Sequence, residues 1–312
     1  MRTNLVVVMD DIAAIKVVKD TTFALMLEGQ RRGLRMYYLN EDQLYLDQAT
    51  CMAEMRPIRV KDDPRSWFEL GDPETRALGP DDLVLMRADP PVDANYLYAT
   101  FLLERAEAAG ARVVNRPQAL RDFNEKLAIA RFPELMPRTR VSSSAAKLKA
   151  FVSELGRAVL KPLDGMGGRG IFLAAADDPN LNVILETLTR NGAETAMAQE
   201  FLPRIDEGDK RILMVHGEPV EYLLARIPGG GDFRGNLARG GRGEGRALTD
   251  EDRRIAARVG PELVRHGIAF AGLDVIGDRL TEINVTSPTC VRELDAEFGI
   301  NIAGSLFDAI LA

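Results

Sequence analysis

The segment from Ala271 to Val285 places three oxygen-bearing side chains where they could act together. Side chains alternate along a β-strand, so Glu282 and Asn284 share one face. A three-residue loop over 277–279 would pair Ile276 with Leu280 and set Asp274 opposite Glu282. Two facing carboxylates destabilise a hairpin unless a cation lies between them. The pattern therefore predicts a metal site at Asp274, Glu282 and Asn284, suited to Mg²⁺ first and to Mn²⁺ as the alternative, which bind oxygen ligands, water and phosphates.

A glycine-rich run from Asp164 to Gly170 follows a lysine, Lys161, and contains Gly165, Gly167, Gly168 and Gly170. A dinucleotide-binding turn would need a helix directly after the glycines. The apolar residues 171–173 and the turn at 177–179 indicate a strand instead, so an NAD-dependent oxidoreductase is disfavoured. A glycine loop between antiparallel strands can close its N–H groups over phosphates, with Lys161 as a point charge.

Residues 229–246 form a third unusual segment, with eight glycines up to position 245 and arginines interleaved among them. A long segment of this kind in a compact enzyme is usually a lid or a disordered linker. A nucleic-acid-binding segment is the alternative, but Phe233 is its single aromatic residue and the chain is acidic. An arginine-bearing lid over anionic substrates is the better interpretation.

The composition limits the possible functions. The 312 residues exceed what one core usually supports, so more than one packed unit is expected. A net charge of −7 gives no footprint for nucleic acid or an anionic membrane. Two cysteines cannot form a disulfide framework, and no apolar run approaches the ~20 residues of a membrane span. We expect a cytoplasmic enzyme with small-molecule substrates.

The elements that must position these residues alternate between strand and helix in the first third. Strands are predicted at 5–9, 35–39, 83–86 and 111–114, and helices at 22–32 and 100–109. This order predicts an open parallel sheet covered by helices. We expect an N-terminal open-sheet domain over residues 1–122.

The remaining residues, 123–312, are expected to form an α+β catalytic domain with a smaller subdomain, 123–202, and a substrate- and metal-binding subdomain, 203–312, with a mobile loop at 227–246. A helix is predicted across 117–132, with proline at its first position. Later expected elements are strands at 138–141, 158–160, 171–174, 195–202, 210–215 and 220–227, helices at 145–155 and 182–189, a helix capped by Thr249, the hairpin 270–285 and two closing helices.

The three chemical segments, in this order and with Lys126 upstream, resemble the ATP-grasp fold, and the full chain resembles the bacterial-type glutathione synthetase family. The resemblance rests on the strings KPLDGMGG (161–168), ARIP (225–228), RGNLA (234–238), GGRGE (240–244), LTEINVTSPT (280–289), MRADPP (86–91) and NRPQALRD (115–122). Asp11 departs from this pattern, where the family's first strand continues with Met-Asp-Pro.

The resemblance implies roles for particular positions. ATP would be bound by Lys126, Lys161 and the glycines 165, 167 and 168, with Glu200, Phe201 and Leu202 at adenine and Asp209 at the ribose. Arg211 and Arg226 would face the transferred phosphoryl group, and Arg234 and Arg242 would act from the lid. Arg87, Asn236, Gly240 and Gly241 would bind substrate.

The implied reaction joins γ-glutamylcysteine to glycine, with ATP converted to ADP and phosphate through an acyl phosphate. A lid would protect that intermediate from water. The family also implies a homotetramer. The alternatives are an ATP-grasp ligase with other amino-acid or peptide substrates and a non-catalytic nucleotide-binding module. Intact Asp274, Glu282, Lys161 and Arg226 speak against the second.

Overall fold

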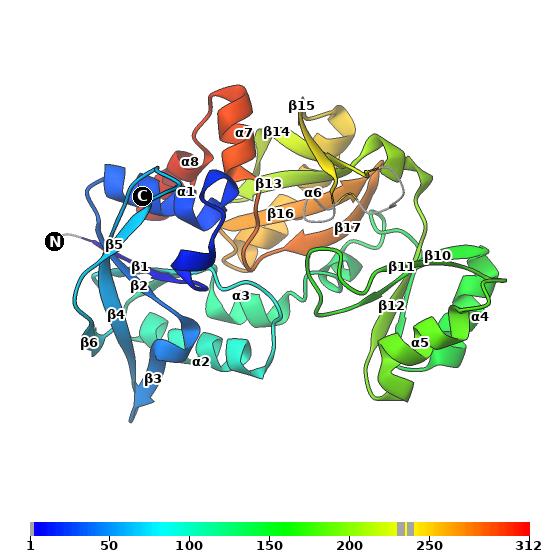
Figure 1. The fold of residues 1–312 in the computed structure, drawn as a ribbon, viewed down its shortest axis with the longest axis horizontal. Coiled ribbons are helices and arrows are strands. Elements are labelled where there is room, and N and C mark those ends of the chain that lie inside the picture. The colour runs from blue at the N-terminus through cyan, green and yellow to red at the C-terminus, as the bar shows by residue number, and fades with distance from the viewer. Residues whose placement is uncertain (1–2, 230–234, 236–239) are drawn as a thin grey trace.

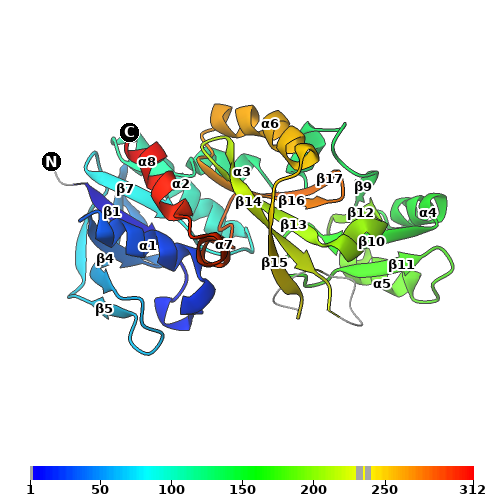
Figure 2. The same cartoon turned by 90° about the horizontal axis from the view of Figure 1, so that it is seen from above.

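The computed structural model describes residues 3–229, 235 and 240–312. Three sheets stand side by side, as Figures 1 and 2 show, with the N-terminal sheet at one end and the four-stranded sheet at the other. None of the helices described is long and apolar enough to span a membrane.

The N-terminal sheet has the order β3-β4-β2-β1-β7-β8, with β5 and β6 paired to β4. Its central strands are parallel, as predicted. Side chains of β1 alternate between two cores: Leu5 and Val7 face one side, and Val6 and Val8 face the other. The strands are β1 Asn4–Val8, β2 Arg35–Leu39, β3 Leu44–Asp47, β4 Thr50–Val60, β5 Phe68–Leu70, β6 Glu74–Ala77, β7 Asp82–Met86 and β8 Arg112–Val114.

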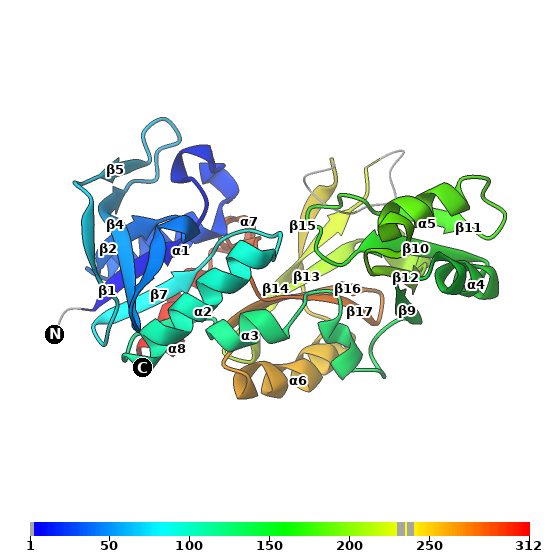
Figure 3. The ribbon, with the colours of Figure 1, turned by 90° about the horizontal axis from the view of Figure 1, so that it is seen from below.

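Helices α1 (Thr21–Arg31) and α8 (Ile302–Leu311) contribute to the core on one face of this sheet, and α2 (Ala94–Ala108) to the core on the other. The end of the chain thus returns to its beginning, as Figure 3 also shows. Glu28 fixes the contact, since it pairs with Arg31 at the end of α1 and with Arg32, the next residue, and Arg32 in turn reaches Asp308 of α8.

The four-stranded sheet has the order β11-β10-β12-β9, and α4 and α5 pack on it around a small separate core. Its elements are β9 Thr139–Ser142, α4 Ala145–Leu155, β10 Arg157–Pro162, β11 Phe172–Ala175, α5 Leu181–Thr189 and β12 Ala196–Glu200. The antiparallel pairing of β10 with β11 confirms that the glycine-rich run connects two strands.

The five-stranded antiparallel sheet has the order β15-β14-β13-β16-β17, and α6 covers one of its faces (Figure 2). Thr249 caps α6 as predicted, because its hydroxyl accepts from the Asp252 amide. The elements are β13 Asp209–Val215, β14 Glu218–Ile227, β15 Arg242–Ala247, α6 Asp250–Arg265, β16 Phe270–Ile276, β17 Arg279–Asn284 and α7 Val291–Phe298.

Three local predictions were wrong. The helix expected across 117–132 divides into α3 (Pro117–Asp122) and a 3-10 turn, η4 (Ala128–Arg131), because the Asn124 side chain accepts from the Lys126 and Leu127 amides and starts a new turn. The end of the expected mobile loop is strand β15, which pairs with β14. Helix α2 begins six residues before position 100, because Asp93 caps it.

Candidate active site

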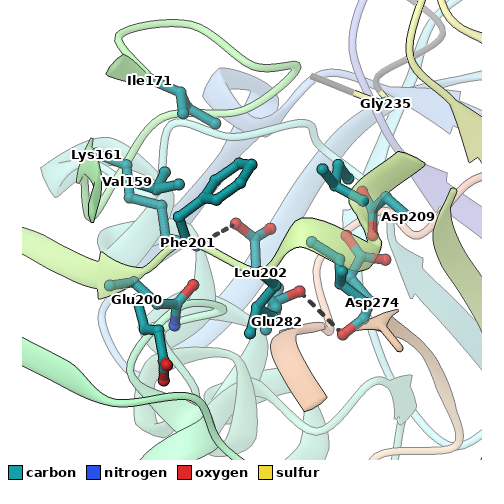
Figure 4. Close-up of a pocket in the computed structure, with 14 residues that line it drawn as sticks. Val159, Lys161, Ile171, Glu200, Phe201, Leu202, Asp209, Gly235, Asp274 and Glu282 are labelled. Atoms are coloured by element: carbon teal, nitrogen blue, oxygen red, sulfur yellow. Dashed lines mark hydrogen bonds and ion pairs between the residues drawn. The ribbon is translucent and has the colours of Figure 1, made fainter. Parts of the chain in front are cut away.

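A cleft lies between the four-stranded and five-stranded sheets. Strand β10 supplies Val159 and Lys161 and strand β12 supplies Glu200 on one side, and Asp209, Asp274 and Glu282 lie on the other (Figure 4). A larger cavity, with about 1530 Å³ of empty space, adjoins it and shares Asp274 and Glu282 with it. These two carboxylates therefore stand where both spaces meet.

The hairpin of β16 and β17 brings the two carboxylates together. Asp274 pairs with Glu282, as predicted, but the predicted turn register was wrong: Ile276 pairs with Arg279 and Val275 with Leu280. A register shift between Asp274 and Val275 compensates, as a β-bulge does by inserting one extra residue. The error in the turn therefore left the important pair in place.

Asp274 is held by two arginines. It accepts from Arg211 Nε and Nη2 at 2.6 and 3.0 Å, and Arg226 Nη2 lies 2.9 Å from its Oδ2. Burial opposes the charged carboxylate, but the two guanidinium groups outweigh it and hold the pKa of Asp274 well below its usual range. Arg226 also donates to Asp209 Oδ2 at 2.5 Å.

Glu282 is held by two lysines. Lys161 Nζ lies 3.3 Å and Lys126 Nζ 3.8 Å from its Oε1, and both lysines are buried. Lys126 Nζ also donates to the Gly165 carbonyl at 2.6 Å. Together these contacts link the carboxylate, both lysines and the first glycine of the loop.

The glycine loop borders the larger cavity through Gly165 and Gly167. Gly167 and Gly168 have φ values of 62° and 74°, a region in which a side chain is strained. Asn124 Nδ2 donates to the Leu163 carbonyl at 3.1 Å and ties the start of the loop to the turn before η4. Backbone N–H groups in such a loop can cradle an anion.

The residues fit a hard divalent cation. Asp274, Glu282 and Asn284 all line the larger cavity, and Asn284 Nδ2 is committed to the Gly272 carbonyl, which leaves its Oδ1 as the ligand atom. Across the described residues no three His, Cys, Asp or Glu side chains come together as a complete metal group. A cation here would therefore share its coordination with water or phosphate oxygens.

The cleft also contains the residues predicted to bind a nucleoside. Glu200 at the end of β12 lines it together with Phe201 and Leu202, which follow the strand, and Asp209 lies across from them. Asp209 Oδ1 is buried and accepts no hydrogen bond from the described part of the chain. Burial, with the charge of Asp274, raises the pKa of Asp209 despite its contact with Arg226. A donor from a ligand, such as a hydroxyl, would satisfy that oxygen.

Several predicted residues lie elsewhere. Arg87 is buried outside both cavities, where it donates to the Pro288 carbonyl at 3.0 Å and to Thr22 Oγ1 at 3.1 Å. Arg242 is 71% exposed and pairs with Glu244, and Gly240 and Gly241 do not line either cavity. Arg234 and Asn236 lie outside the described residues.

Sequence reasoning missed part of the larger cavity. Glu125 lines it, as do Ser287 and residues that precede α1, including Lys16 and Lys19. Asn124 was the available signal in the sequence, because an asparagine side chain that accepts from the following amides interrupts a helix. Such an interruption would have indicated that Glu125 does not lie within a continuous helix. Nothing in the local pattern near Lys16 indicates that this segment faces a cavity built by distant strands.

Comparisons with known proteins agree with this geometry. The prokaryotic glutathione synthetase N-terminal domain model matches residues 3–121, and the ATP-grasp domain model of the same enzyme matches residues 125–299. A glutathione synthetase of Xanthomonas campestris pv. campestris is 62% identical over 312 residues, covering 100% of this chain and 99% of its own. One of Vibrio cholerae is 55% identical over 304 residues, covering 97% and 96%.

Solved structures show the same fold at low sequence identity. The D-cycloserine synthetase DcsG has a TM-score of 0.67 at 13% identity, covering 98% of both chains. The ATP-grasp ligase PsnB, complexed with a precursor peptide and AMPPNP, has a TM-score of 0.62 at 18% identity, covering 100% of this chain and 97% of its own.

Proposed function

Because the chain belongs to the prokaryotic glutathione synthetase family, we propose that the cleft between the four- and five-stranded sheets binds ATP and that the larger cavity binds the two substrates to be joined. The chain is an ATP-dependent ligase of glutathione biosynthesis, and its family depends on a divalent metal. The observation that carries the site assignment is the Asp274–Glu282 pair, flanked by two arginines and two lysines at the junction of both spaces.

We propose that Lys126 and Lys161 bind ATP phosphates, assisted by the amides of the glycine loop. Both lysines now neutralise Glu282, and either can turn to a phosphate that enters the cleft. Glu200, Phe201 and Leu202 would contact adenine, and the unsatisfied Oδ1 of Asp209 would accept from a ribose hydroxyl. Asp274, Glu282 and Asn284 would hold Mg²⁺ or Mn²⁺, which would neutralise charge on the phosphates.

In the proposed reaction the cysteinyl carboxylate of γ-glutamylcysteine attacks the γ-phosphorus of ATP, forming an acyl phosphate and releasing ADP. The amine of glycine then attacks the acyl carbon, loses a proton and displaces phosphate, giving glutathione. Arg211 and Arg226 lie buried at the edge of the cavity, where fixed guanidinium groups can stabilise negative charge on the acyl phosphate. No side-chain nucleophile is required.

The experiment that tests the function measures ADP, phosphate and peptide product from purified protein with Mg²⁺. We expect ADP and phosphate only when γ-glutamylcysteine and glycine are both present, in equal amounts with glutathione. A panel of other amino acids and dipeptides serves as the control. Turnover with another pair and none with this one would overturn the substrate assignment and leave the ATP-grasp fold intact.

Three further assignments rest on the family. We propose a cytoplasmic location, a homotetramer, and a division into an N-terminal domain, 1–122, and a catalytic domain, 123–312. The contact of α8 with α1 means that the two domains share a core, so unfolding should not separate them cleanly. Light scattering should give four times the 34.3 kDa chain mass, whereas a value of 34.3 kDa would contradict the tetramer.

A further inference from the structure

Glu125 differs from the other carboxylates near the reaction centre. Asp209, Asp274 and Glu282 each lie within ion-pair distance of an arginine or a lysine. Glu125 lines the same larger cavity, yet within residues 3–229, 235 and 240–312 it forms no ion pair. Lys126 and Arg87 act on its charge only from beyond ion-pair distance, so no described lysine or arginine contacts the carboxylate where the substrates must bind.

The two oxygens of Glu125 have different surroundings. Oε1 accepts from the Val285 amide at 3.1 Å, from the Thr286 amide at 3.3 Å and from Thr286 Oγ1 at 2.8 Å. The Glu125 carbonyl accepts from the Ile283 amide at 2.9 Å, which fixes the backbone beside β17. Oε2 has no hydrogen-bond partner among the residues described. The carboxylate is thus held by one oxygen and presents the other.

A pre-positioned carboxylate with no cation in direct contact can bind a cationic ligand. The anions of this reaction, phosphates and carboxylates, have arginines and lysines to receive them. A metal ion is the first cationic candidate, but in the described structure Glu125 does not join Asp274 and Glu282 in a metal-binding group. Its bonds run to Val285 and Thr286, beyond the last predicted ligand, Asn284.

The remaining cations are the primary ammonium groups of the substrates. γ-Glutamylcysteine carries one on its glutamyl end and glycine carries one on the reacting end, so this step rests on the proposed function. Burial raises the pKa of Glu125, and the charge of Glu282 acts in the same direction. An ammonium ligand would favour the ionised carboxylate.

We propose that Glu125, through Oε2, binds the primary ammonium group of a substrate in the larger cavity. Its Oε1 contacts fix its direction before the ligand arrives, which reduces the ordering needed on binding. Either substrate can supply the group, and the experiment below separates the two sources.

The test replaces Glu125 by glutamine. Glu125→Gln keeps an oxygen that can accept from Val285 and Thr286, but removes the charge and places an N–H donor toward the ligand. We expect the KM of one amine-bearing substrate to rise about ten- to a hundredfold, the range for a lost hydrogen bond to a charged group. The KM for ATP should change less than about twofold. Glu186→Gln, an equal charge change at an exposed position on α5, should match wild type.

The source is identified with glutaryl-cysteine, which lacks the glutamyl ammonium group. If this group binds Glu125, wild type prefers γ-glutamylcysteine to the analogue and Glu125→Gln loses that preference. If glycine binds there, the preference is kept and the KM for glycine rises. Glu125→Asp, which keeps the charge on a shorter side chain, should raise the same KM by less and serves if the glutamine variant does not fold.

Unchanged KM values for both amine substrates, in either variant, would overturn the proposal. A raised metal requirement with unchanged amine KM values would make Glu125 a metal ligand and would also overturn it. Absence of glutathione formation by wild type would instead reject the proposed function, so the two failures are distinguishable.

Discussion

Asp274→Asn should weaken both turnover and folding, because Asp274 is the shared partner of two buried arginines. Asp209, Asp274, Arg211 and Arg226 together carry no net charge when all are ionised. The substitution leaves one excess positive charge in a buried group. Arg211 then has no carboxylate partner among the described residues, while Arg226 retains Asp209.

The magnitude follows from the cost of breaking a buried ion pair, about 3–5 kcal/mol. The asparagine oxygen can still accept one hydrogen bond from Arg211, and the cavity is open to water, so we take about 3 kcal/mol. At roughly 2–4 °C per kcal/mol the midpoint of thermal unfolding, Tm, should fall by about 6–12 °C. Turnover should fall more than about a hundredfold, since loss of groups that only orient metal ligands already costs 10–100-fold.

The matched control is Glu282→Gln, which removes the facing carboxylate. Its lysine contacts are longer, at 3.3 and 3.8 Å, and its side chain is 19% exposed, so the expected loss of stability is smaller than for Asp274→Asn. Turnover should be lost to a similar degree. Tm by scanning calorimetry and kcat by ADP release measure both effects. A Tm for Asp274→Asn equal to or above wild type would refute the view that the arginine pairs hold this site together.

Three other substitutions test contacts that hold the fold together. Lys210 pairs with the fully buried Asp252 and also donates to the Gly277 carbonyl, and Lys210→Met removes both contacts. The free energy of unfolding should fall by about 3–5 kcal/mol, and an unchanged Tm would contradict this. Hydrogen bonds lower the pKa of Glu28 to about 2; those from Arg31 contribute most, and those from Arg32 and Asn301 contribute further. The ionised Glu28 therefore stabilises the fold fully above about pH 4.5, and this stabilisation is lost as the pH falls toward 2. Glu28→Gln should therefore lower Tm at pH 7. Between about pH 4.5 and 2 the Tm of the variant should fall less steeply than the Tm of the wild type, and equal slopes would reject the linkage. Gly260→Ala would place its Cβ 2.0 Å from the Gly217 carbonyl oxygen and should cost at least about 1–3 kcal/mol, while Gly79→Ala, with open space around it, should be near neutral in urea unfolding.

Local patterns predicted the parts of the site that depend on alternation along a strand. Asp274 and Glu282 were placed opposite each other from sequence, and the structure confirms the pair although the turn register was wrong. The turn is one residue shorter than predicted, which shifts the pairing by one residue. The bulge between Asp274 and Val275 shifts the pairing back by one residue, so Asp274 still lies opposite Glu282. The glycine loop was found because its glycines exceed the needs of a simple turn.

Non-local contacts could not be predicted in the same way. The alternation of buried Cys51, Ala53 and Met55 was a signal for β4, but nothing near it shows that β4 pairs antiparallel with β2. Arg87 was expected at a substrate, yet it supports the Pro288 carbonyl from 201 residues away. Glu125 was hidden inside a predicted helix, which Asn124 interrupts.

Transfer of oxygen between substrates tests the central claim most directly. If the cysteinyl carboxylate of γ-glutamylcysteine carries ¹⁸O and attacks the γ-phosphorus of ATP, each phosphate released should contain one labelled oxygen, visible as a shifted ³¹P resonance. ADP should be the nucleotide product. Unlabelled phosphate, or AMP with labelled carboxylate oxygen in its phosphoryl group, would contradict an acyl phosphate formed at the Asp274–Glu282 site.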